Sequence, residues 1–200
     1  MLDNYNLREQ RASNATGWMH MTLYLDMDGV LADFFKGLAL YYGVDHWKKI
    51  PEKEKSIAAL GGSDFFNRLD VFETSVQLVE FAKDFGDWGI CSSPLRGDRD
   101  NSAYWKRVWL ERNGFLPEVD KLIFTGQKEH YAVDSIDGTP NILIDDKPSN
   151  IKQWIAAGGI GIRYQANEDD LEEYLFDEIH RAIKHAKETR MRLYPYTKEF

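Results

Sequence analysis

The sequence has one cysteine, no long apolar run and fewer basic than acidic residues, and each shortage excludes something. Cys91 is the only cysteine, so no disulfide can form within the chain and no CxxC metal site exists. This sparing use of cysteine suits a reducing compartment, and we expect a cytoplasmic protein. A membrane-spanning helix needs a run of about 18 apolar residues, which this sequence lacks, so we expect no membrane contact.

Acidic residues outnumber basic ones, 33 to 25, and the formal net charge is -8. A chain this acidic repels a polyanion over most of its surface, so we expect no stable complex with nucleic acid. The same charge balance still allows a local basic pocket that binds one phosphate. Hydrophobic residues make up 43% of the sequence, enough for the core of one domain with a modest insertion.

Short apolar runs alternate with amphipathic segments along most of the chain. We expect strands over residues 22–26, 88–91, 121–124, 141–144 and 160–164, and helices over residues 32–42, 73–85, 102–113, 149–157 and 169–192. Pro51 sits at a good first-turn position for a further short helix within residues 48–60. This alternation predicts an α/β fold, a three-layer, Rossmann-like parallel sheet with helices on both faces. Residues 1–20 are polar, and we expect them to form a flexible extension.

Polar side chains follow the ends of the predicted strands. Asp26 and Asp28 stand two residues apart at the end of the first strand, and Gly29 lets the chain turn sharply after them. Three more polar clusters follow later strands: Ser92 with Ser93, then Lys128, then Asp145 with Asp146. Because the carboxyl ends of parallel strands meet at one edge of a sheet, we expect these residues to converge on one crevice.

Several carboxylates around one point suit a hard cation with oxygen ligands, and Mg²⁺ is the natural candidate. Asp26 is placed to attack phosphorus and form an aspartyl-phosphate. Asp28 is placed to protonate the leaving oxygen and then to activate water. Ser92 and nearby amides would hold phosphate oxygens, while Lys128 would neutralise charge on the transferring group. The residues therefore predict Mg²⁺-dependent phosphoryl transfer.

The order of these motifs resembles the haloacid dehalogenase superfamily of phosphotransferases, and most closely its 5'(3')-deoxyribonucleotidases. The resemblance spans about residues 22–164 and is carried by four segments: Leu25–Phe34, Asp64–Leu69, Ile90–Leu95 and Leu143–Pro148. In the third segment, Ser92 stands where the family has threonine, which keeps the hydroxyl. The segment between Lys128 and Asp145 is longer than is usual in the family.

The resemblance implies a core domain of residues 21–33 and 71–200 and a small helical cap, residues 34–70, inserted after the first strand. It implies Asp26 as nucleophile and Asp28 as acid and base. Ser92 and Ser93 would bind the phosphate, and Lys106 and Lys128 would contact phosphate or substrate. The implied magnesium ligands are Asp26, the backbone carbonyl of Asp28, and Asp146, with Asp145 close by.

The resemblance also suggests a nucleotide substrate, whose base would stack on aromatic residues of the cap: Phe34, Phe65 and Phe66. The alternative is that these rings form the core of the cap itself. For the substrate, we expect a deoxynucleoside or nucleoside monophosphate. A polynucleotide 3'-phosphate, a sugar phosphate and a non-catalytic phosphate-binding role remain open. The presence of both Asp26 and Asp28 argues against lost catalysis. A homodimer is also left open.

Overall fold

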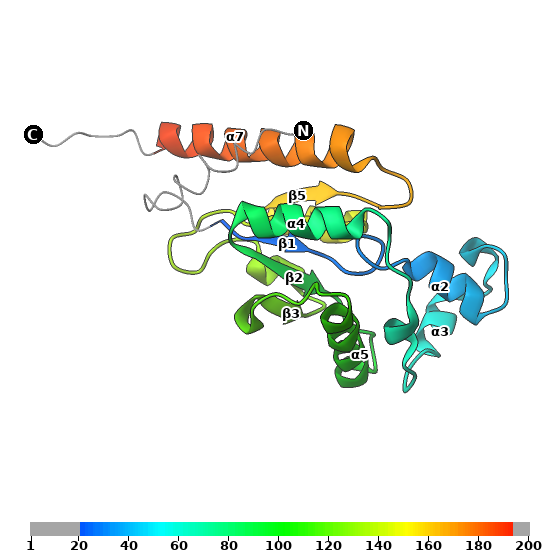
Figure 1. The fold of residues 1–200 in the computed structure, drawn as a ribbon. Helices are drawn as coiled ribbons and strands as arrows, with labels where there is room; N and C mark the ends of the chain where they lie inside the picture. Colours follow the sequence, from blue (N-terminus) through cyan, green and yellow to red (C-terminus); the bar gives the residue numbers. More distant parts are fainter. Residues whose placement is uncertain (1–20, 194–200) are drawn as a thin grey trace, which may run out of the picture.

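The structure, a computed structural model, describes residues 21–193, with Lys187 and residues 189–193 described by their backbone alone (Figure 1). The predicted flexible extension, residues 1–20, lies outside the described residues. Over the described part of the chain, no helix combines the length and the hydropathy that crossing a membrane requires.

A parallel five-stranded sheet forms the centre of the molecule. Its strands are β1 (Leu23–Leu25), β2 (Trp88–Ser92), β3 (Leu122–Phe124), β4 (Ile142–Asp145) and β5 (Ile160–Arg163), in the order β3-β2-β1-β4-β5. On β1, Leu25 is paired with Ile90 of β2 and with Ile144 of β4. The chain winds outward from β1 in both directions, so a topological switch point lies between β1 and β4. Ligands of such sheets bind beyond the carboxyl ends of the strands at that point.

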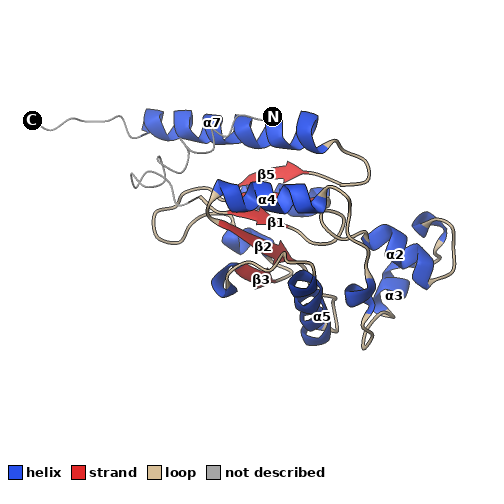
Figure 2. Cartoon of the chain, in the orientation of Figure 1, coloured by secondary structure: helices blue, strands red, loops and turns tan. Residues whose placement is uncertain are grey.

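Helices cover both faces of the sheet, so the predicted three-layer α/β fold is confirmed (Figure 2). Side chains of successive strand residues point to opposite faces. Leu23 and Leu25 belong to the larger core, into which α4 (Ser75–Phe85), α5 (Arg99–Arg112) and α7 (Asp177–Leu193) also pack. Tyr24 belongs to a smaller core formed with α6 (Pro148–Ala156) and the 3-10 helix η4 (Lys128–Tyr131). A further 3-10 helix, η3 (Val119–Lys121), precedes β3.

The expected elements are present, and two of the longer helices differ from expectation at their starts. The helix expected from residue 102 begins at Arg99. Its start was predicted too late because the first turn is polar and carries no apolar periodicity. The helix expected over residues 169–192 is π-helical over Leu171–Phe176 (η5) and α-helical from Asp177. Asp170 caps it, because its side chain accepts a hydrogen bond from the backbone N–H of Glu173 at 2.7 Å.

Residues 34–70 form a group of short helices beside the sheet, seen at the right of Figure 1. These helices are α2 (Phe34–Tyr41), η1 (Trp47–Lys49), α3 (Lys53–Ala58) and η2 (Phe65–Arg68). The placement of Pro51 in the first turn of a helix was wrong. Glu52 adopts a left-handed conformation with a φ of 45°, so α3 starts only at Lys53. That this insertion is a separate cap domain stays a prediction.

The second half of the insertion is fastened along α5. At one end of α5, Asp98 accepts a hydrogen bond from the backbone N–H of Gly62 at 2.9 Å. Farther along, the buried indole of Trp109 donates to the backbone carbonyl of Leu69 at 2.8 Å. At the last residue of the helix, the guanidinium of Arg112 donates to the backbone carbonyl of Asn67 at 2.8 Å. These bonds span the whole length of α5.

We predict that Trp109→Phe destabilises the protein by about 1–3 kcal/mol, because the buried carbonyl of Leu69 would lose its donor and part of the ring volume would be lost. Chemical denaturation would measure the change in unfolding free energy. Trp105→Phe, at a partly buried neighbour on the same helix, is the control and should cost less. Equal stability of Trp109→Phe and the unmodified protein would contradict the importance of this bond.

Candidate active site

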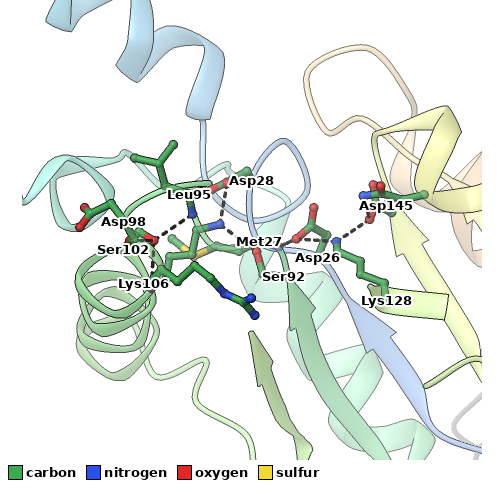
Figure 3. A network of polar contacts seen from close by, with 12 residues as sticks. Asp26, Met27, Asp28, Ser92, Leu95, Asp98, Ser102, Lys106, Lys128 and Asp145 are labelled. Carbon is green, nitrogen blue, oxygen red and sulfur yellow. Dashed lines mark hydrogen bonds and ion pairs between the residues drawn. The ribbon is translucent and has the colours of Figure 1, made fainter. Parts of the chain in front are cut away.

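The polar residues predicted from strand ends do converge at the carboxyl edge of the sheet. Asp26 directly follows β1, Ser92 is the last residue of β2, and Asp145 is the last residue of β4. Two lysines approach from outside the sheet: Lys106 from α5 and Lys128 from the first position of η4. Figure 3 shows Asp28 and Lys106 to one side of Asp26, and Lys128 and Asp145 to the other.

The first half of the site is built around Lys106, whose side chain is fully buried. Its Nζ lies 2.6 Å from Oδ2 of Asp28 and donates to Oγ of Ser92 at 2.9 Å. The same ammonium lies 4.8 Å from the ring centroid of Phe66, a cation–π contact. Lys106 therefore joins the end of β2, the loop after β1 and the helical insertion.

The second half is built around Lys128, which is also buried. Its Nζ contacts Oδ1 of Asp26 at 3.0 Å and donates to Oδ2 of Asp145 at 2.5 Å. Asp145 is held further by Asn150, whose amide donates to Oδ2 at 2.9 Å, and by the backbone N–H of Lys147, which donates to Oδ1 at 2.8 Å. The two lysines thus separate three carboxylates that would otherwise repel one another.

Burial and charge act in opposite directions on these acids. Burial alone would raise the pKa of Asp26, but Lys128, Lys106 and a hydrogen bond with Ser92 outweigh it and hold that pKa below its usual value. Burial, opposed by Lys106 and reinforced by Asp26, raises the pKa of Asp28. The two neighbouring aspartates therefore differ: the pKa of Asp26 is lowered, which suits a nucleophile, and the pKa of Asp28 is raised, which suits a general acid.

Three acidic side chains form a candidate metal site. Ligand oxygens of Asp26, Asp145 and Asp146 all lie within 4.8 Å of one another. Burial, followed by repulsion from Asp26 and Asp145, raises the pKa of Asp146 to about 8. A cation bound among these oxygens would remove that repulsion, and an all-oxygen ligand set matches what Mg²⁺ prefers. The residues present therefore fit a magnesium ion.

Gly29 makes room for this cluster. Its φ is +78°, and a Cβ at this position would come within 2.6 Å of Oδ2 of Asp146. The glycine predicted to allow a sharp turn thus also allows the close approach of an acidic side chain from the loop after β4.

The remaining site residues take different positions. The carboxylate of Asp28 does not join the three-acid cluster, and the predicted use of its backbone carbonyl as a metal ligand stays a prediction. Ser93 follows β2 and is partly exposed. Phe65 and Phe66 are only 3% and 4% exposed, which favours the view that they form the core of the insertion. Phe34 is partly buried and stacks on Phe66 with ring centroids 6.4 Å apart.

Two residues that support the site were missed at the sequence level. Asn150 orients Asp145 as described above, and Ser102 fixes the loop after Ser93. The hydroxyl of Ser102 accepts a hydrogen bond from the backbone N–H of Leu95 at 2.9 Å and donates to the backbone carbonyl of Asp98 at 2.7 Å. Asn150 could have been suspected from its place in the first turn of the helix after the acidic pair. Ser102 carried no such signal.

Comparison with proteins of known structure gives the fold a context. No family model matches the sequence, and no curated protein matches it. One similar structure is described as a dehalogenase: its TM-score is 0.52 at 10% identity, over 78% of this chain and 89% of the other. Another is described as a HAD-hydrolase, YfnB from Bacillus subtilis, bound to magnesium. Its TM-score is 0.50 at 12% identity, and the match covers 76% of this chain and 90% of the other. The chain therefore has the fold of haloacid dehalogenase-like hydrolases.

We predict that Gly29→Ala weakens Mg²⁺ binding, because its Cβ would push the carboxylate of Asp146 away from the cluster. Gly43→Ala is the matched control: its φ is +64° and nothing lies within 4 Å of the added Cβ. Both changes should cost roughly 1–2 kcal/mol of stability for the left-handed conformation. Titration calorimetry with Mg²⁺ would separate them, and equal Mg²⁺ affinity in the two folded variants would contradict the predicted role of Gly29.

Proposed function

We propose that this protein is a Mg²⁺-dependent phosphomonoesterase that works through an aspartyl-phosphate on Asp26. The observation that carries this proposal is the unbroken chain of contacts that runs from Asp28 through Lys106, Ser92, Asp26 and Lys128 to Asp145. It pairs a carboxylate whose pKa is lowered with one whose pKa is raised, two residues apart at the end of one strand. A phosphoryl-transfer site needs these two different carboxylates, one as nucleophile and one as acid and base.

In the first step, a carboxylate oxygen of Asp26 forms a bond to phosphorus, and the ester P–O bond on the opposite side breaks. The leaving oxygen takes the bonding electron pair and receives a proton from the carboxyl group of Asp28, so an alcohol departs. Lys128, 3.0 Å from Asp26, offsets negative charge as the phosphoryl group approaches. Ser92 is close enough to Lys106 and Asp26 to add a hydroxyl contact to a phosphate oxygen.

In the second step, water attacks phosphorus and gives a proton to the carboxylate of Asp28. The bond between Asp26 and phosphorus breaks, and its electron pair returns to Asp26 as the carboxylate. Inorganic phosphate leaves, and both aspartates regain their starting states. When bound by Asp26, Asp145 and Asp146, Mg²⁺ would screen the repulsion between the nucleophile and the phosphate. The magnesium bound to YfnB, which shares this fold, supports that assignment.

For the substrate we propose a nucleoside monophosphate, with the 5'(3')-deoxyribonucleotidase activity that the four motifs suggest. Partly buried aromatic rings of the insertion support this choice. Phe35 and Trp47 lie with ring centroids 4.7 Å apart, and Phe34 contacts both Phe35 and Phe66. Phe66 in turn lies over Lys106. An aromatic group is therefore continuous with Lys106, and a planar base could stack on its partly exposed rings.

We predict that Asp26→Asn lowers the rate of phosphate release by about 10³-fold or more, because the amide is a far weaker nucleophile than the carboxylate. The assay would measure phosphate release from deoxynucleoside and nucleoside 5'- and 3'-monophosphates, sugar phosphates and a 3'-phosphorylated oligonucleotide, with Mg²⁺ and with chelator. Asp100→Asn, which removes an exposed carboxylate from α5, is the control and should keep full activity.

Several outcomes would change the proposal. Release from sugar phosphates or the oligonucleotide alone would keep the chemistry and discard the nucleotide. Undiminished release in chelator would contradict the role of Mg²⁺. Full activity of Asp26→Asn, or no release by the folded unmodified protein from any substrate, would overturn the phosphomonoesterase itself.

A further inference from the structure

Lys106 has two of its N–H donors engaged by oxygen atoms, and an aromatic ring lies against its ammonium group. An ammonium group has three N–H donors. Asp28 and Ser92 take contacts at 2.6 and 2.9 Å, and the face of Phe66 lies 4.8 Å away. The side chain is fully buried. A phosphate could bind Lys106 directly only by displacing one of these three partners.

The two carboxyl oxygens of Asp28 differ in their hydrogen-bond partners. Oδ2 is fixed by Lys106 at 2.6 Å. Oδ1 is buried and has no hydrogen-bond partner among the described residues. A buried carboxyl oxygen without a partner costs free energy, so a group that fills this position is expected when the site works. Oδ1 is thus the atom free to exchange a proton with the substrate.

Phe66 belongs to the insertion rather than to the sheet, yet it covers the lysine from which Asp28 takes its orientation. Phe66 is itself wedged in place: Phe65 packs edge-on against it, with ring centroids 5.4 Å apart, and Phe34 stacks on it. Trp109 and Arg112 bind the backbone carbonyls of Leu69 and Asn67, so the backbone that carries Phe66 is held against α5.

We propose that Lys106 is a positioning residue, held by Phe66, which fixes Oδ2 of Asp28 so that Oδ1 faces the departing oxygen. This inference rests on the proposed phosphomonoesterase activity and gives Lys106 and Phe66 roles different from those suggested by sequence. Lys106 acts on the substrate through Asp28 rather than by binding phosphate. Phe66 acts through Lys106 rather than by stacking on a base.

The leaving group distinguishes the two roles of Lys106. An alkoxide such as the ribose oxygen is a poor leaving group and needs the proton of Asp28 as the P–O bond breaks. The nitrophenolate of p-nitrophenyl phosphate is stable as an anion and leaves without that proton. A misplaced Asp28 therefore slows the first substrate and largely spares the second, whereas a lost phosphate contact slows both equally.

The experiment compares kcat/KM for the best alkyl phosphomonoester of the panel and for p-nitrophenyl phosphate, in the folded, Mg²⁺-loaded protein. For Lys106→Met we expect a loss about 100-fold larger on the alkyl ester than on p-nitrophenyl phosphate, within the range of general acid catalysis. For Phe66→Leu, which keeps an apolar side chain but removes the ring face, we expect roughly a ten-fold larger loss on the alkyl ester.

Phe85→Leu is the control, because Phe85 is also a buried core phenylalanine, at 8% exposure, but lies on α4 rather than on the insertion and so holds neither Phe66 nor Lys106. It should lower the melting temperature and affect both substrates equally. In the double variant Lys106→Met with Phe66→Leu, the difference between the losses on the two substrates should equal that of Lys106→Met alone. The reason is that the effect of Phe66 passes through Lys106.

Equal losses on both substrates in Lys106→Met and Phe66→Leu, with raised KM, would overturn this inference and restore a direct phosphate contact. If Phe66→Leu still slows the alkyl ester more than p-nitrophenyl phosphate when Lys106 is already Met, the coupling between Phe66 and Lys106 is overturned. If the unmodified protein hydrolyses neither ester, the proposed function fails and this inference fails with it. If it hydrolyses both, the comparison of variants judges the inference alone.

Discussion

The alternation of charge at the carboxyl edge of the sheet is the constraint on which this structure depends. The carboxylates of Asp26, Asp28 and Asp145 meet where β1 and β4 end. Burying a carboxylate without a charged partner costs several kcal/mol of folding free energy. Lys128 lies between Asp26 and Asp145, and Lys106 lies between Asp28 and Ser92. Removing Lys128 would leave the buried carboxylates of Asp26 and Asp145 without a cation between them, and removing Lys106 would leave Asp28 without its charged partner. The lysines are therefore as much a part of the fold as of its chemistry, and the residues around them are arranged to keep them in place.

Helix α5 connects the parts of the site that the sheet does not. Its Ser102 and Lys106 are one turn apart on one face, where the first fixes the backbone at Leu95 and the second fixes the hydroxyl of Ser92. Farther along, Trp109 fastens the insertion at Leu69. One helix thus positions three parts of the site. These are the loop that would hold a phosphate, the side chain of Asp28, and the end of the insertion that carries the aromatic group. A proposed catalytic geometry that is shared among three chain segments needs such a rigid common support.

The sequence was most informative where function follows from a strand end. Asp26, Ser92 and Asp145 could be placed because buried apolar runs end directly at them, and parallel strands bring those ends together. The partners of Lys106 could not be predicted, because they depend on how α5 packs against the sheet and how the insertion closes over it. The start of α5 at Arg99 and the late start of α3 were missed for a local reason: polar first turns carry no periodicity, and a left-handed Glu52 leaves no mark in the sequence.

The pairing of β1 with β4 has a consequence for how the protein folds. Leu25 and Ile144 are neighbours in the sheet although more than a hundred residues separate them, and the backbone N–H of Thr22 reaches Asn141 across a separation of 119 residues. Closing a loop of this length is entropically costly and slow. Asp26 comes from one side of this junction, and Asp145 and Asp146 come from the other. The proposed cation site cannot form before the junction closes, so a magnesium-sensitive signal during refolding would time the completion of the sheet.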